Sequence, residues 1–320
     1  MINLLLNVLM TIAGFVILIK CADYFVDGAA SFAKNFKIPT VVIGLTIVAF
    51  GSSAPELAIS FNSHLSGNTD MLFGNVIGSS ISNILLILGL AVLIRPFKIN
   101  GDVIKKEIPI LLLVTLGFSV LFLDNLFDNS IPNTLTRSDG IVLILFFTIF
   151  VYYLIAILKN SDNSTENQEP KYKTLVSIIL MILGLAGIIW SSDLIVNNAA
   201  EIAASIGISQ KIISVTIISI GTSLPELITT ITAAKKGENG MAIGNIVGSN
   251  IFNICIVIGL PVALLGDVST AAFSVVDIFY MLIAVVLLWV FSAIDRDLRR
   301  YEASILIGIY ATYGIYIFMQ

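Results

Sequence analysis

The sequence alternates long apolar runs with short polar loops. The runs recur at lengths near or above the roughly 20 residues that a helix needs to cross a bilayer. The pattern predicts ten membrane-spanning helices, at 3–33, 38–65, 71–94, 104–124, 139–158, 174–204, 208–235, 241–265, 271–294 and 302–319. We therefore expect an all-α integral membrane protein that crosses the bilayer many times.

Composition supports a membrane protein. The chain is 57% hydrophobic and 12% charged, whereas a soluble domain carries about 25% charged residues. Cys21 and Cys255 both lie in apolar runs, which argues against a disulfide framework or a cysteine-based zinc site. The expected surroundings are the lipid bilayer. No nucleic-acid partner and no cofactor are expected, and the sequence does not reveal an oligomeric partner.

Basic residues predict the orientation in the cell membrane, because cytoplasmic loops carry an excess of Lys and Arg. Loops after the odd-numbered helices hold 14 of them, and the opposite side holds two, Arg137 and Lys211. Both termini should therefore lie outside. The most hydrophilic stretch, 159–173, should be a cytoplasmic linker.

Two short polar segments, called the first and second phrase, lie inside apolar sequence, and each occurs twice in the chain. Gly-Ser-Ser-Ala-Pro-Glu at 51–56 returns as Gly-Thr-Ser-Leu-Pro-Glu at 221–226, and the phrase at 74–79 returns at 244–249. Every repeat is offset by 170 positions, because 226 − 56 = 244 − 74 = 170. The offset pairs Glu56 with Glu226, Ser53 with Ser223, Ser79 with Ser249 and Asn83 with Asn253. A carboxylate in hydrocarbon is costly, so its duplication indicates a function.

The repeat predicts the domain organisation. Residues 1–158 form a first five-helix repeat, with its polar phrases in 44–85, and 174–320 form a second, with its phrases in 214–255. Five is odd, so the second repeat enters the membrane from the opposite side, and the two halves are inverted copies. Inverted repeats with broken helices around a midplane site are a recurring transporter design. The alternative is that duplication only built a larger bundle.

The first phrase predicts a break in the second helix. Gly51 permits unusual backbone angles, and Pro55 removes a hydrogen-bond donor, so the helix should break around 51–55. We expect the break to free the backbone carbonyl of Ala49 and to present Ser52 and Ser53 beside Glu56. The seventh helix repeats this arrangement with Ser219, Thr222, Ser223 and Glu226.

The second phrase predicts close helix packing in the third and eighth helices, which we also expect to be broken. Its glycines let helices approach closely. Ser79 and Asn83 lie four residues apart, as do Ser249 and Asn253, so each pair shares one helical face. All four side chains should point to the same centre.

The predicted centre combines two carboxylates with hydroxyl, amide and carbonyl oxygens. This donor set suits Ca²⁺, Na⁺ or Mg²⁺ rather than zinc or copper. Calcium takes roughly 6–8 oxygen ligands in a flexible geometry. Two close carboxylates at low dielectric cannot both stay ionised unaided, so cations or protons must occupy the centre.

With these phrases at 51–56, 74–79, 221–226 and 244–250, the sequence strongly resembles the cation/calcium exchanger superfamily, specifically its prokaryotic sodium/calcium exchangers. The resemblance covers nearly the whole chain. It implies electrogenic Na⁺/Ca²⁺ antiport by alternating access, with Glu56 and Glu226 binding Ca²⁺ and sharing in Na⁺ binding. Asn83 and Asn253 would border the middle of the site.

The resemblance also implies finer roles. The implied Na⁺ ligands are Ser52, Ser53, Ser79 and the Ala49 carbonyl on one side, and Thr222, Ser223, Ser249 and the Ser219 carbonyl on the other. Some relatives carry Asp where this chain has Asn253, which favours potassium-independent exchange. Asp23 and Asp193, also 170 apart, would lie in the access paths of a sliding pair formed by the first and sixth helices. Alternatively, these two carboxylates have only a structural role, with Lys20 a candidate partner for Asp23.

Three other functions remain to be distinguished. Ca²⁺/H⁺ exchange would use the same carboxylates, although the hydroxyl-rich flanks favour Na⁺. A passive cation channel is less compatible with an inverted repeat. An intramembrane serine protease needs a histidine base inside the membrane, and the lone histidine, His64, lies near a helix end. The chain is therefore not expected to be an enzyme.

Overall fold

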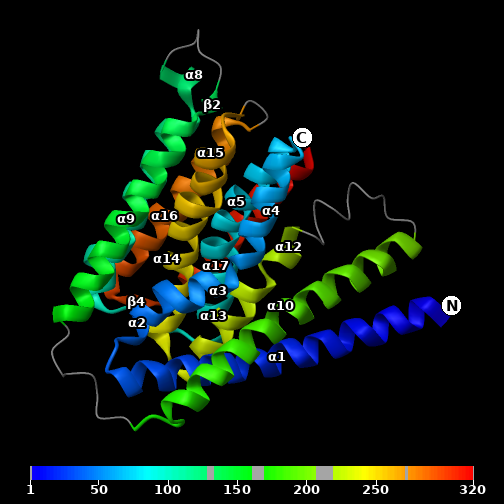
Figure 1. Ribbon diagram of the computed structural model, residues 1–320, viewed down its shortest axis with the longest axis vertical. Coiled ribbons are helices and arrows are strands. Elements are labelled where there is room, and N and C mark those ends of the chain that lie inside the picture. Colours follow the sequence, from blue (N-terminus) through cyan, green and yellow to red (C-terminus); the bar gives the residue numbers. More distant parts are fainter. Residues whose placement is uncertain (1, 128–132, 161–168, 207–218, 271–272, 320) are drawn as a thin grey trace.

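The computed structural model describes residues 2–127, 133–160, 169–206, 219–270 and 273–319, and these are mostly helical (Figure 1). The helices up to the linker are α1 (Ile2–Phe36), α2 (Thr40–Ile43), α3 (Ala49–Ser52), α4 (Ala54–Leu65), α5 (Thr69–Ser82), α6 (Gly89–Ile94), α7 (Ile108–Phe122), α8 (Asp124–Phe127) and α9 (Arg137–Asn160). Those after it are α10 (Thr174–Ser205), α12 (Ser219–Thr222), α13 (Leu224–Lys236), α14 (Asn239–Phe252), α15 (Gly259–Leu265), α16 (Val275–Asp295) and α17 (Arg300–Met319). The π-helical segments within the described residues are η1 (Gly44–Val48), η2 (Asn83–Leu88), η3 (Val103–Glu107) and η5 (Asn253–Ile258).

Many of these helices are suited to a membrane. Within the described ranges, six are long and apolar enough to cross a bilayer, or seven if one bent pair counts as a single span. The multi-pass, all-helical character is thereby confirmed. The number ten stays a prediction, and residues 208–218 of the expected seventh helix lie outside the described residues.

The second predicted helix breaks where its sequence indicates. Thr40–Ser52 and Ala54–Leu65 meet at Ser53 with a bend of 45°. Pro55 falls in the first turn of α4, where its missing N–H removes no helical hydrogen bond. Ser223 separates α12 from α13 in the same way, with Pro225 in the first turn of α13.

The expected breaks in the third and eighth helices are wrong. Thr69–Ile94 and Asn239–Leu265 are each one uninterrupted helical span. Glycine keeps its backbone donor, so the glycines of 74–79 and 244–249 allow close packing without ending the helix. The irregularity takes another form: each span changes to a π-helix, at Asn83 in η2 and at Asn253 in η5.

α14 lies at the centre of the molecule and packs against α2, η1, α3 and α13. Its contact with α2 and η1 depends on two glycines. A Cβ on Gly44 would lie 2.5 Å from the Met241 carbonyl oxygen, and one on Gly244 would lie 2.5 Å from the Val41 carbonyl oxygen. The two backbones therefore approach more closely than any other residue would allow.

α1 and α10 lie side by side along most of their length, at one edge of the helix bundle (Figure 1). Two short antiparallel ladders, which the sequence pattern did not predict, join the halves elsewhere. β1 (Phe97–Lys98) pairs with β4 (Asp297–Leu298), and β2 (Thr134–Leu135) pairs with β3 (Val268–Ser269).

Candidate ion-binding site

Two carboxylates from the two halves are buried in the centre of the molecule. Glu56 lies in the first turn of α4 and Glu226 in the first turn of α13, and their side chains are 0% and 1% exposed. They are close enough to interact electrostatically. The helix breaks place each of them at a helix N-terminus, where unpaired backbone N–H groups favour negative charge.

Serines from both breaks bridge the halves. The Ser53 hydroxyl donates to Glu226 Oε1 at 2.9 Å. The hydroxyls of Ser79 and Ser223 lie 3.3 Å apart and share a hydrogen bond. The structure thus brings together residues that lie more than 140 positions apart in the chain.

Two asparagines complete a second set of contacts between the halves. Ser52 Oγ donates to Asn245 Oδ1 at 3.4 Å, and Thr222 Oγ1 donates to Asn75 Oδ1 at 3.3 Å. The two contacts are related by the 170-residue offset: a hydroxyl at the break of one half meets an asparagine of the other half. Neither Asn75 nor Asn245 was predicted as a site residue. The signal was present, because both are the second residue of the repeated Gly-Asn phrase.

Asn245 also forms hydrogen bonds to two threonines of α13. Its Nδ2 donates to Thr229 Oγ1 at 3.1 Å and to Thr230 Oγ1 at 2.8 Å. Thr229 in turn donates to the Pro225 carbonyl at 2.7 Å. Asn245 therefore ties the first turn of α13, which carries Glu226, to α14.

Six buried oxygens of the predicted site residues have no hydrogen-bond partner in the described part of the chain. They are both carboxylate oxygens of Glu56, Glu226 Oε2, Asn83 Oδ1, Asn253 Oδ1 and Ser249 Oγ. Buried polar atoms are nearly always paired, so a cluster of unpaired ones needs an explanation. Asn83 and Asn253 are also the first residues of η2 and η5, and π-helical turns are frequent at functional sites.

The backbone carbonyl of Ala49 is hydrogen-bonded, although the helix break was expected to leave it free. It accepts a hydrogen bond from the Ser53 backbone N–H at 3.0 Å and another from Ser52 Oγ at 3.3 Å, so the break does not free it. The reason is that Pro55 lacks the N–H that would pair with residue 51, four positions earlier, not with Ala49. Ser219 begins α12, but its side chain lies outside the described residues, and a ligand role for its carbonyl stays a prediction.

The two aspartates expected on access paths lie apart from this centre. Asp23 Oδ1 is 3.4 Å from Lys236 Nζ, so Lys236 on α13, rather than Lys20, is its ionic partner. Asp193 is exposed on α10. An access-path role for either residue stays a prediction.

The donor set at the centre is hard and carries two negative charges. Among the residues that the structure describes, no group of three or more His, Cys, Asp and Glu side chains could hold a metal ion. The candidate site therefore combines two carboxylates with neutral amide and hydroxyl oxygens. Such a set fits Ca²⁺ and Na⁺ and lacks the sulfur or imidazole ligands that zinc and copper prefer.

Known proteins are similar to this chain over most of its length. The family described as "Sodium/calcium exchanger protein" matches residues 6–156 and 176–319. The chain is 38% identical to the "Putative antiporter CaxA" of Alkalimonas amylolytica, covering 98% of this chain and 99% of that protein. It is also 38% identical to "Inner membrane protein YrbG" of Escherichia coli (strain K12), covering 85% of this chain and 84% of that protein. A solved structure of the sodium-calcium exchanger NCX_Mj, soaked with Na⁺ and Sr²⁺, superposes with a TM-score of 0.83 at 30% identity, covering 97% of this chain and 98% of the other.

Proposed function

Because this chain belongs to the sodium/calcium exchanger family, we propose that it is an antiporter that exchanges Na⁺ for Ca²⁺ across the cell membrane. The exchange proceeds by alternating access. The transported ions are substrates, and the protein needs no cofactor.

One observation carries this proposal: five predicted site residues from both halves supply six unpartnered, buried oxygens, and three of the six belong to Glu56 and Glu226. The number matches the 6–8 oxygens that calcium takes. A divalent cation also cancels the charge of the two carboxylates. A carrier with its charges cancelled can reorient within the membrane, whereas two uncompensated carboxylates at low dielectric would oppose that movement.

Sodium is the proposed coupling ion because hydroxyl groups flank the carboxylates in both halves. The proposed Na⁺ ligands are Ser52, Ser53 and Ser79 in one half, and Thr222, Ser223, Ser249 and the Ser219 carbonyl in the other. Protons would need no such ligands. With Asn253 neutral, the centre has two acids rather than three, and we propose that exchange does not depend on potassium. If more than two Na⁺ ions enter per Ca²⁺, the exchange is electrogenic.

We propose that alternating access uses the α1–α10 pair. These two helices pack against each other, beside the helices that carry the candidate site. We place both termini outside and the 159–173 linker in the cytoplasm, following the distribution of basic residues. In this arrangement the halves 1–158 and 174–320 are inverted five-helix repeats, and Asp23 and Asp193 lie on opposite access paths.

The test is calcium flux in proteoliposomes with controlled gradients. A sodium gradient alone should drive ⁴⁵Ca²⁺ uptake, and a proton gradient without sodium should not. Uptake that persists with protons and no sodium would instead identify a Ca²⁺/H⁺ exchanger. Single-channel currents above carrier turnover would identify a passive channel.

A further inference from the structure

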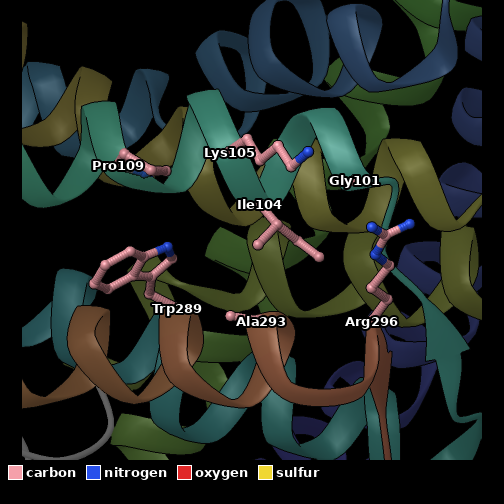
Figure 2. Close-up of a pocket in the computed structure, with 7 residues that line it drawn as sticks. All are labelled: Gly101, Ile104, Lys105, Pro109, Trp289, Ala293 and Arg296. Atoms are coloured by element: carbon pink, nitrogen blue, oxygen red, sulfur yellow. The ribbon is translucent and has the colours of Figure 1, made fainter.

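A cavity of roughly 380 Å³ opens between η3–α7 and α16 (Figure 2), and neither of the two buried carboxylates lines it. Its walls are of two kinds. The apolar part comes from Ile104, Pro109, Trp289 and Ala293, and the charged part from Lys105 and Arg296. The proposed ion exchange uses none of these residues.

The two kinds of wall lie at different ends. Figure 2 shows Trp289 and Pro109 at one end of the cavity and Arg296 at the other, with the Lys105 amine directed toward the Arg296 end. The cavity is therefore amphipathic along its length. An apolar molecule or a small anion alone would match only one end.

The position along α16 relates the cavity to the membrane boundary. The apolar span of this helix ends at Ile294, and Arg296 lies two residues beyond it. Trp289 lies seven residues earlier, which corresponds to about 10 Å along a helix. Its side chain is 40% exposed. Tryptophan is enriched at the level of lipid headgroups and Arg just beyond it, so the cavity extends across the interface between hydrocarbon and water.

Both cations lack an acidic partner among the described side chains. Lys106, the neighbour of Lys105, is 3.6 Å from Asp102 and accounts for that carboxylate. No ion pair of Lys105 or Arg296 is found in the described part of the chain. Two like charges that face one cavity repel each other unless an anion lies between them.

Main-chain contacts hold Arg296 in place at its end of the cavity. Arg296 has φ of +56°, and its carbonyl accepts a hydrogen bond from the Ile99 N–H at 2.9 Å. The adjacent β1–β4 ladder joins this segment to the start of η3. Arg296 is therefore held beside Gly101 by main-chain contacts rather than extending freely from a flexible tail.

We propose that this cavity binds an anionic phospholipid, with its phosphate between Lys105 and Arg296 and its acyl chain along Trp289. Basic pockets between membrane helices at the cytoplasmic boundary are suited to such headgroups. The placement of the cavity in the cytoplasmic leaflet rests on the proposed orientation of the chain. The proposed binding of the phospholipid does not depend on that orientation. Failure of lipid binding would leave the ion-exchange proposal untouched.

Tryptophan fluorescence provides a direct test, because the chain has two tryptophans, Trp190 and Trp289. The variant W190F leaves Trp289 as the only reporter. This variant is reconstituted in phosphatidylcholine with a small fraction of brominated phosphatidylglycerol or of brominated phosphatidylcholine. The brominated phosphatidylglycerol should quench Trp289 more strongly at the same mole fraction, whereas equal quenching by the two lipids would overturn the proposal.

Charge variants in the W190F background test the assigned residues. K105Q and R296Q should each lower the preference for phosphatidylglycerol about five-fold. K106Q is the matched control, since it removes the same charge from the neighbouring position outside the cavity, and it should keep the preference. A preference that survives in both K105Q and R296Q would contradict the assignment.

Inorganic phosphate distinguishes the lipid from a free anion. Millimolar phosphate should leave the quenching by brominated phosphatidylglycerol unchanged, because it supplies no acyl chain for the Trp289 end. Loss of quenching on adding phosphate would show that the cavity selects the free anion and would overturn the lipid proposal.

Discussion

Ser53 donates a hydrogen bond to Glu226 at 2.9 Å, but the equivalent bond from Ser223 to Glu56 does not form. Ser223 pairs with Ser79 instead, and both oxygens of Glu56 lack a hydrogen-bond partner within the described residues. The two halves have matching residues but different contacts. An antiporter built from repeats needs such asymmetry, because alternating access requires the two sides to differ in any one state.

The Ser53 contact leads to a first prediction. S53A removes a hydrogen bond to a buried carboxylate, and it should weaken the apparent sodium affinity of exchange about ten-fold. The measurement is the sodium dependence of ⁴⁵Ca²⁺ uptake in proteoliposomes. S63A is the control, since Ser63 is buried in α4, the helix that Ser53 precedes, without contributing to the candidate site. Equal sodium affinity in S53A and wild type would count against Ser53 as a ligand.

Asn253 provides a second prediction, on ion selectivity. N253D adds a third carboxylate to a centre that has two, and the extra charge should change the dependence of exchange on sodium, potassium and calcium. N83D makes the same change at the matching position of the other half. Calcium uptake is measured while each cation is varied in turn. Unchanged dependence on all three ions in N253D would mean that this position does not set selectivity.

The close approach of η1 and α14 predicts a stability effect. In G44A, the added Cβ would lie 2.5 Å from the Met241 carbonyl oxygen, so one backbone must shift. Overpacking of this kind costs about 1–3 kcal/mol, and the thermal unfolding midpoint should fall. G308A is the matched control, because no described atom lies within 4 Å of its new Cβ. A midpoint that is equal for G44A and G308A would refute the tight contact.

A cluster of ion pairs around Asp27 predicts a pH dependence. Asp27 lies 2.6 Å from Lys171 Nζ and 2.7 Å from Lys236 Nζ, and it joins α1 to the segment that precedes α10 and to the end of α13. The hydrogen bond to Asp27 raises the pKa of Lys171 above its ordinary value of 10.5. A raised pKa of a base adds stability that is complete below the ordinary value and is lost as pH rises through the folded value.

K171M should therefore lower stability by less than about 1 kcal/mol, as expected for an exposed ion pair. The difference from wild type should stay constant between about pH 7 and pH 9 and shrink only above the ordinary lysine pKa. Thermal unfolding of both proteins across this range is the measurement. A difference that disappears already below about pH 9 would contradict the assigned partner.

The repeated phrases predicted the two helix breaks because proline and glycine act locally on the backbone. The positions of Ser53 and Ser223 follow from Pro55 and Pro225, which must lie in the first turn of the helix that follows. The burial of Glu56 and Glu226 in one centre was likewise expected, because a carboxylate within an apolar run is costly unless it faces the protein interior.

Other features could not be predicted from one sequence. The π-helical turns at Asn83 and Asn253 depend on how neighbouring helices pack, and no residue type specifies them. Asp23 has Lys20 nearby in sequence, yet it pairs with Lys236, more than 200 positions away. The Ser53–Glu226 bond and its missing counterpart could not be predicted either, because the repeated residues are the same in both halves and indicate no difference between them.

Sodium-gradient-driven ⁴⁵Ca²⁺ uptake by E56Q and E226Q proteoliposomes tests the central proposal most directly. E107Q is the matched control, since Glu107 is also buried but lies outside the candidate site and accepts a hydrogen bond from Tyr153. We predict that E56Q and E226Q each lose on the order of 100-fold or more of the uptake, while E107Q retains it and all three remain folded. Wild-type uptake by either E56Q or E226Q would contradict calcium binding by the paired carboxylates.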